Sequence, residues 1–247
     1  LNRDPAIRVV ATARDPYEAR DAIIAHKPDV MTLDVELPRM NGIEFLRKLM
    51  PQYPLPVVVI SALSDKVFDA LNVGAVDFVA KPAVSSREQL EAFIQNELLV
   101  KIKIASTANI SRIKQKAMHQ EQSVLPPKGG DLVVAIGAST GGTEAIFSVV
   151  QNFGTDIPGV VIVQHMPPGF TNMYAKRLDN QCRVVVKEAE TGDQVKPGHV
   201  LIAPGGDRHM RLVKVNGVYQ VECKAGPKVN GHCPSVDVLF DSVARVA

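Results

Sequence analysis

The 247-residue sequence lacks several features that would place it in special classes of protein. No apolar run approaches the ~18 residues that a membrane-spanning helix needs, and no signal peptide opens the chain. There are only three cysteines, Cys182, Cys223 and Cys233, and their spacing is not that of a metal site. The net charge is only +2 at pH 7. We therefore expect a cytoplasmic protein with reduced thiols, no direct membrane insertion and no overall attraction for nucleic acid.

Charge is distributed unevenly along the chain. Residues 101–130 carry 6 Lys and Arg against 1 acidic residue, whereas residues 131–247 carry 11 of each sign. The basic segment is polar and ends in Pro-Pro-Lys-Gly-Gly. This composition predicts a linker at 106–130 that joins one domain at 1–105 to a second domain at 131–247.

Both predicted domains alternate strand and helix signals. Apolar, β-branched runs predict strands at 6–13, 29–35, 56–62, 76–82, 132–137, 159–164, 183–189 and 199–204. Helical patterns stand between them, with Asp15 and Ser235 as candidate N-caps and with Leu90 among the expected core positions of a helix at 87–105. The run 210–223 predicts a β-hairpin that turns at Asn216-Gly217. The alternation predicts the α/β class, with a doubly wound parallel sheet in each domain.

Three polar side chains stand at strand ends in the first domain. Asp34, Ser61 and Lys81 each lie at the carboxyl end of a predicted strand, and in an open parallel sheet this edge binds ligands. A carboxylate, a hydroxyl and an ammonium group suit phosphoryl transfer, with Asp34 as the attacking group. From position alone it is equally reasonable that Asp34 caps a loop and that Lys81 is an ordinary surface residue.

The surrounding motifs favour the first interpretation. "DVMTLDVELPRMNG", "VVVISA" and "GAVDFVAKP" resemble a response-regulator receiver domain, whose fold is flavodoxin-like, over about the first hundred residues. The resemblance implies that Asp34 accepts phosphate from a histidine kinase and that Ser61 and Lys81 respond to it. It also implies a Mg²⁺ held by Asp34, by the main-chain carbonyl of Glu36 and by an acidic pair after a first strand. That strand and that pair are absent here. If the protein itself lacks them, we expect that Asp34 is not phosphorylated.

The stretch "DLVVAIGASTGGTEAI" opens the second domain with a strand, a turn of small residues and a helix. It fits a phosphate-binding loop poorly, because no Lys follows the glycines and Ala138 stands before Ser139. Gly137, Ser139 and Gly141 spell G-x-S-x-G, a turn that exposes a nucleophilic serine near free helix N–H groups. The pattern favours a nucleophile over a phosphate cradle and leaves both open.

A serine nucleophile needs a base. His165 directly follows the strand 159–164, so it should emerge at the same sheet edge as Ser139. His199 precedes its strand and should face the opposite edge. His209 is a weaker candidate, and His232 could approach from a loop. We therefore predict that His165 is the base, although each of these histidines could be an ordinary surface residue.

Motifs throughout the chain then point to one family. "IGASTGGTEAI", "QHMPPGF", "VKEAETGD", "IAPGGDRHM" and "PSVDVLFDSVA" resemble the catalytic domain of the chemotaxis protein-glutamate methylesterases, the CheB family. The resemblance implies Ser139 as nucleophile, His165 as base and Thr140 beside them. It implies methylated chemoreceptors as substrates, hydrolysis of their glutamate γ-methyl esters, deamidation of receptor glutamines, and no cofactor for the esterase.

The family's third catalytic residue is an Asp in a Gly-Met-Gly-x-Asp-Gly stretch, which we expect beyond Ala247. Asp207, Asp237 and Asp241 match other family segments. The residues up to Ala247 should therefore be nearly inactive by themselves, since loss of the orienting carboxylate costs roughly 10⁴-fold in turnover in the serine triad.

Two other output functions stay open at this point. The second domain could bind DNA, but its balanced charge is unfavourable for phosphate contacts. It could also bind a nucleotide without catalysing a reaction.

Overall fold

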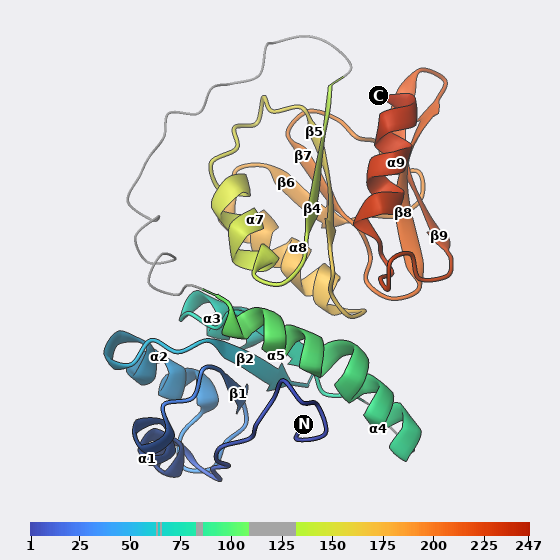
Figure 1. Cartoon of the computed structure of the whole chain (residues 1–247). Helices are drawn as coiled ribbons and strands as arrows, with labels where there is room; N and C mark the ends of the chain where they lie inside the picture. Colours follow the sequence, from blue (N-terminus) through green and yellow to red (C-terminus); the bar gives the residue numbers. More distant parts are fainter. Residues whose placement is uncertain (63, 65, 83–85, 109–131) are drawn as a thin grey trace. The chain divides into compact units, whose positions relative to one another are not determined.

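The computed structural model describes residues 1–62, 64, 66–82, 86–108 and 132–247. The chain divides into two compact units, Leu1–Gln120 and Glu121–Ala247. Figure 1 gives the element labels of both units, and each is described by itself. Most of the predicted linker, residues 109–130, lies outside the described residues. The domain limits proposed from the composition therefore stay a prediction.

A parallel sheet with the strand order β1-β2-β3 forms the centre of the first unit. Its strands are β1 (Met31–Asp34), β2 (Val57–Ser61) and β3 (Asp77–Ala80). Its helical segments are α1 (Pro16–His26), α2 (Gly42–Gln52), α3 (Lys66–Asn72), α4 (Arg87–Phe93), the π-helical stretch η1 (Ile94–Leu98) and α5 (Leu99–Ser106). Val57, Val58 and Val59 of the middle strand are fully buried, as expected for a strand that is covered on both faces.

Two expectations for this unit are wrong. Residues 6–13 form no strand, although the run is apolar. A strand requires a neighbour for its backbone hydrogen bonds, and among the described residues none pairs with this segment. Ile7 packs against the core instead, while Val9 and Val10 are exposed. Leu90 is also exposed, at 41%, because α4 buries none of its side chains.

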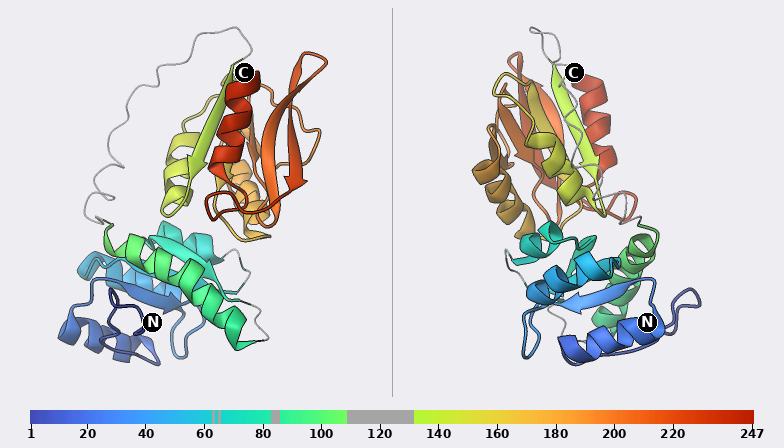
Figure 2. Two further views of the ribbon diagram at one scale, coloured as in Figure 1. Left: turned by 45° about the vertical axis from the view of Figure 1, so that its right-hand side comes forward. Right: turned by 90° about the vertical axis from the view of Figure 1, so that its left-hand side faces the viewer.

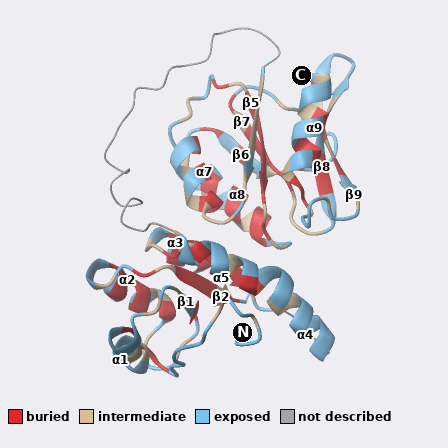
Figure 3. Ribbon diagram, in the orientation of Figure 1, coloured by how far each residue is buried: buried red, intermediate tan, exposed pale blue. Residues whose placement is uncertain are grey.

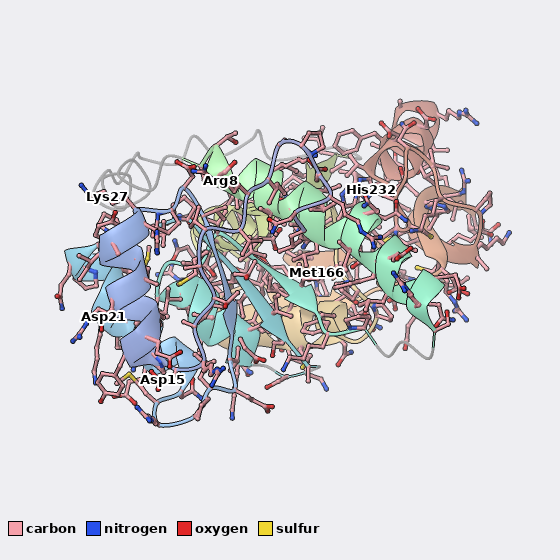
Figure 4. The ribbon with its side chains drawn as sticks, turned by 60° about the horizontal axis from the view of Figure 1, so that its bottom comes forward. Arg8, Asp15, Asp21, Lys27, Met166 and His232 are labelled. Atoms are coloured by element: carbon pink, nitrogen blue, oxygen red, sulfur yellow. The ribbon has the colours of Figure 1, made fainter. Side chains whose placement is uncertain are left out.

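Helix α1 has a capping residue at each end, and the first of them, Asp15, is the one that the sequence predicts. The Asp15 carboxylate accepts hydrogen bonds from the N–H groups of Tyr17 and Glu18, at 2.9 and 3.0 Å, and so caps the helix. At the other end Lys27 adopts a left-handed conformation, with φ of 45°, and its N–H bonds to the carbonyl of Ile23. Figure 4 labels Asp15 and Lys27 at the two ends of this helix.

The second unit is built on a parallel sheet with the strand order β4-β5-β7-β6. The strands are β4 (Val133–Ala138), β5 (Gly159–Gln164), β6 (Val185–Glu188) and β7 (His199–Ile202), and the hairpin strands are β8 (Arg208–Val215) and β9 (Val218–Ala225). The helices are α7 (Gly142–Val150), α8 (Phe170–Gln181) and α9 (Val236–Val246). Helices α7 and α8 cover one face of the sheet, and α9 with the hairpin covers the other (Figure 2). The α/β class predicted for both units is confirmed.

Every residue of β5 is buried, as the red colouring in Figure 3 shows. Val161 and Val163 of this strand point into a cluster with Met210, Val221 and Leu239, which come from the hairpin and α9. One part of the core of the unit therefore lies between the sheet and the hairpin layer, and it holds the carboxyl ends of β4 and β5 in place.

The hairpin turns at Asn216-Gly217, as predicted. Both residues have positive φ, 50° and 83°, which is the geometry of the tight turns that Asn-Gly favours. Ser235 stands at the N-cap of α9, but its side chain makes no capping bond. Its N–H group donates instead to Nδ1 of the buried His209. The predicted position of the cap is therefore confirmed, but the side-chain bond expected of a serine cap is not formed.

Candidate active site and phosphoacceptor site

Ser139 and His165 lie at one rim of the second sheet. Each follows directly after a strand, Ser139 after β4 and His165 after β5, and the two parallel strands pair Ala138 with Gln164. His165 Nδ1 lies 3.2 Å from Ser139 Oγ. Ser139 is exposed and His165 is half-buried. Because the two parallel strands end at the same edge of the sheet, these two side chains lie within hydrogen-bond distance of each other.

The turn after Ser139 leads straight into helix α7. Gly141 has a φ of 74°, a conformation that favours glycine, and the N–H of Gly142 donates to the carbonyl of Ser139 at 2.7 Å. Among the residues that the structure describes, no acceptor binds the N–H groups of Thr140 and Gly141. These donors, together with the positive end of α7, can stabilise a developing oxyanion beside Ser139.

The other candidate histidines have different places. His232 is exposed, and its ring stacks on the ring of His165, with centroids 3.8 Å apart and an interplanar angle of 11°. His209 is buried, and both of its ring nitrogens are engaged, by Ser235 N and by the carbonyl of Pro227. His199 begins β7 and therefore lies at the opposite end of the sheet. His209 is thus held in the interior and His199 lies at the far end of the sheet, whereas His232 lies against His165.

Two side chains of helix α8 bind the first turn of helix α7. The fully buried Tyr174 donates its hydroxyl to the carbonyl of Thr143 at 2.7 Å, and burial raises the pKa of this phenol well above its usual range. Arg177 forms an ion pair with Glu144, at 3.2 Å, one residue further along α7. Sequence patterns did not indicate these contacts because they join elements about thirty residues apart.

In the first unit, Lys81 reaches Asp34. Lys81 Nζ lies 2.6 Å from Asp34 Oδ2, and the N–H of Glu36 donates to Asp34 Oδ1 at 2.9 Å. Both side chains are partly exposed, at 39% for Lys81 and 35% for Asp34. Ser61 is buried at the end of the adjacent strand, and its carbonyl accepts from Lys81 N at 2.7 Å. The Asp34 carboxylate therefore lies at this rim, and the Lys81 ammonium group can offset negative charge that is added to it.

Few ligands for a metal ion lie near Asp34. A divalent cation could use the Asp34 carboxylate and the main-chain carbonyl of Glu36, since Mg²⁺ usually takes one or two carboxylates together with waters and phosphate oxygens. In the described part of the chain no three His, Cys, Asp or Glu residues form a group that could hold a metal. The described residues therefore fit only part of the expected Mg²⁺ site.

Comparisons with known proteins find a match for each of the two domains. Residues 134–247 match the family described as CheB methylesterase, and residues 1–95 match the response regulator receiver domain. A protein-glutamate methylesterase/protein-glutamine glutaminase 2 of Syntrophomonas wolfei is 62% identical over 252 residues, an alignment that covers 100% of this chain and 72% of that protein. The protein-glutamate methylesterase/protein-glutamine glutaminase of Salmonella typhimurium is 48% identical and is covered to 71%.

Solved structures also match the chain. The crystal structure of the Thermotoga maritima CheB methylesterase catalytic domain is 42% identical, with a TM-score of 0.46, over 48% of this chain and 62% of that chain. The response regulator domain of Thermotoga maritima CheB is 38% identical, with a TM-score of 0.40, over 44% of this chain and 83% of that chain. No helix within the described residues is long and apolar enough to cross a membrane.

Proposed function

The chain belongs to the CheB methylesterase family and carries a receiver domain ahead of its catalytic domain, and on this premise we propose how its residues act. The substrates are glutamate γ-methyl esters on chemoreceptors, and receptor glutamines that are deamidated. The relatives named for both activities support this proposal. They do not favour the alternative of a DNA-binding or nucleotide-binding output domain. The free thiols of Cys182, Cys223 and Cys233 agree with a cytoplasmic location.

Acyl transfer from the ester proceeds in two steps. Ser139 Oγ attacks the ester carbonyl while His165 Nδ1, 3.2 Å away, takes the hydroxyl proton. The N–H of Thr140, the residue after the nucleophile, stabilises the oxyanion. The protonated His165 then donates to the departing methoxide, and methanol leaves. Water hydrolyses the glutamyl-enzyme by the same proton transfers. For a glutamine substrate the leaving group is ammonia. The Ser139–His165 pair at the start of α7 is the observation that carries this mechanism.

Methanol release from methylated receptor tests the esterase mechanism in the full-length protein. We expect Ser139→Ala to lower turnover on the order of 10⁶-fold, as removal of the nucleophile does in a serine protease. Ser148→Ala is the matched control, because Ser148 is an exposed serine on α7 whose hydroxyl donates to the carbonyl of Glu144. Unchanged methanol release from Ser139→Ala would rule out this mechanism.

Asp34 is the phosphoacceptor in this proposal, and a histidine kinase of the chemotaxis system is the donor. The carboxylate attacks the phosphoryl group, and Lys81, at 2.6 Å, offsets the added charge. Ser61 donates its hydroxyl to a phosphoryl oxygen. Asp34 and the Glu36 carbonyl would hold a Mg²⁺, which would supply charge neutralisation for the incoming phosphate. Phosphorylation then activates the esterase.

The phosphoacceptor role is tested with the isolated kinase and the full-length protein. We expect Asp34→Asn to abolish stimulation of the esterase by the phosphorylated kinase and to leave basal methanol release unchanged. Asp29→Asn is the control, because Asp29 is an exposed aspartate that precedes the same strand. Stimulation that persists in Asp34→Asn would exclude Asp34 as the acceptor.

A further inference from the structure

Gln164 is a buried polar residue to which the sequence patterns assign no role. It ends β5, lies directly before His165, and is only 3% exposed. A buried amide usually finds hydrogen-bond partners that fix its position. The nearer of its two partners here is Ser139, which follows the neighbouring strand β4.

The amide of Gln164 joins the two halves of the Ser139–His165 pair. Its Nε2 donates to the carbonyl of Ser139 at 2.9 Å and lies 3.4 Å from the carbonyl of His165. In the reverse direction, the N–H of His165 donates to the carbonyl of Ala138 at 3.2 Å. The segment before each functional side chain is therefore bonded to the other strand.

The chemistry of these partners determines which way the amide faces. Both partners of Nε2 are carbonyls, which only accept, so the NH₂ group must point toward them. Oε1 then faces the start of α7, where a Cβ on Gly142 would lie 2.1 Å from it. Oε1 is buried and has no hydrogen-bond partner among the described residues. The amide therefore packs directly against the helix start that follows Ser139.

We propose that Gln164 is a positioning residue for acyl transfer, a role that rests on the proposed function. Its amide sets the turn at Ser139 relative to His165 and to the first N–H groups of α7. The Ser139 carbonyl keeps a second donor, Gly142 N at 2.7 Å, so the turn survives loss of the amide but its place is less well defined. A displacement of about 1 Å at a catalytic group can lower turnover on the order of 10²-fold.

Gln164→Met tests this role in the full-length protein. Methionine has a similar length and lacks both the donor to Ser139 and the unpartnered Oε1, so stability should change little. We expect kcat for methanol release to fall about 10- to 100-fold, with KM for methylated receptor within about twofold of wild type. The rate at which a serine-directed phosphonate labels Ser139 should fall by the same factor as kcat.

Two further variants make the test decisive. Gln164→Asn keeps the amide but is one methylene too short to reach Ser139, so it should lose kcat as well, and it replaces the methionine variant if that does not fold. Gln151→Met is the control, because Gln151 is exposed and its amide donates to the carbonyl of Ser148. Folded Gln164 variants with wild-type kcat and labelling rate, or with a change in KM alone, would overturn the proposal.

Ser139→Ala, measured in parallel, separates this inference from the proposed function. If wild-type methanol release does not depend on Ser139, the proposed function fails. If it does depend on Ser139 while the Gln164 variants turn over like wild type, only the positioning role fails.

Discussion

Gly137 offers a sharp test of how the second unit packs. In the sequence it is the first glycine of G-x-S-x-G, where small residues allow a tight turn. In the structure it lies within β4, paired with Val163, and needs no left-handed conformation. A Cβ at this position would lie 2.3 and 2.9 Å from the two γ-carbons of Val236 and 3.2 Å from Cζ of Phe240. Gly137 is therefore required by the close approach of α9.

The expected cost of Gly137→Ala follows from these distances. Real Cβ atoms essentially never approach another atom within 3.0 Å, so α9 or β4 must shift. Inserting a methyl group into such packing destabilises the folded protein by about 1–3 kcal/mol. Replacement of Gly by Ala also restricts the unfolded chain, which stabilises the protein by about 0.4–1 kcal/mol. We expect a net loss of about 1–2 kcal/mol in the free energy of unfolding.

A double-mutant cycle with Val236→Ala identifies the cause. Because the two nearest atoms are both γ-carbons of Val236, their removal should make room for the new methyl group. Val236→Ala alone should cost about 1 kcal/mol for partly buried methyl groups. The double variant should then be about as stable as Val236→Ala alone, with a coupling energy of about 1–2 kcal/mol.

Urea unfolding of the four proteins, read from the midpoint of the transition of the second unit at constant m-value, measures this coupling. Effects that simply add in the double variant would show that contact with Val236 does not explain the glycine. Full stability of Gly137→Ala would refute the close approach itself.

The remaining predictions concern single side chains. Tyr174→Phe removes the buried hydrogen bond to the carbonyl of Thr143 and should cost about 1 kcal/mol in urea unfolding; an unchanged midpoint would contradict that bond. The pKa of Asp15 is held below 3.8 chiefly by the N–H of Glu18, so its contribution to stability is present above pH 3.8 and is lost as the pH falls through the lower, folded value. Asp15→Asn should therefore flatten the acid side of the stability profile of the first unit, and a profile identical to wild type would exclude this linkage. Burial raises the pKa of the Cys223 thiol to about 11, so iodoacetamide at pH 8 should alkylate it roughly a hundredfold more slowly in the folded protein than in urea; equal rates would show that the thiol is accessible and unperturbed.

Local patterns were sufficient for much of the fold. The Asp15 cap and the Asn216-Gly217 turn depend on contacts between residues close in sequence, and both are confirmed. The strand-end rule needed only the order of strands and helices, because parallel strands end at the same edge wherever they lie in the chain. That rule sufficed to predict that Ser139 would lie near His165 and Asp34 near Lys81.

Contacts between residues far apart in the chain determined two features that the sequence patterns did not predict correctly. Residues 6–13 have the composition of a strand, but composition cannot supply the neighbouring backbone that a strand requires. Leu90 fits a helical stripe, yet it is exposed, and only Phe93 of α4 packs against the core cluster of the first unit.

By itself, the sequence determined the α/β class, the family, and the nucleophile and base to expect at one sheet edge. Only the tertiary structure decided how that edge is held. The Gln164 amide under Ser139, the His232 ring on His165 and the approach of α9 to Gly137 all join segments far apart in the chain. Periodicity and motif spacing reflect interactions between residues that are close in sequence, whereas these contacts form only when the helices and strands pack together.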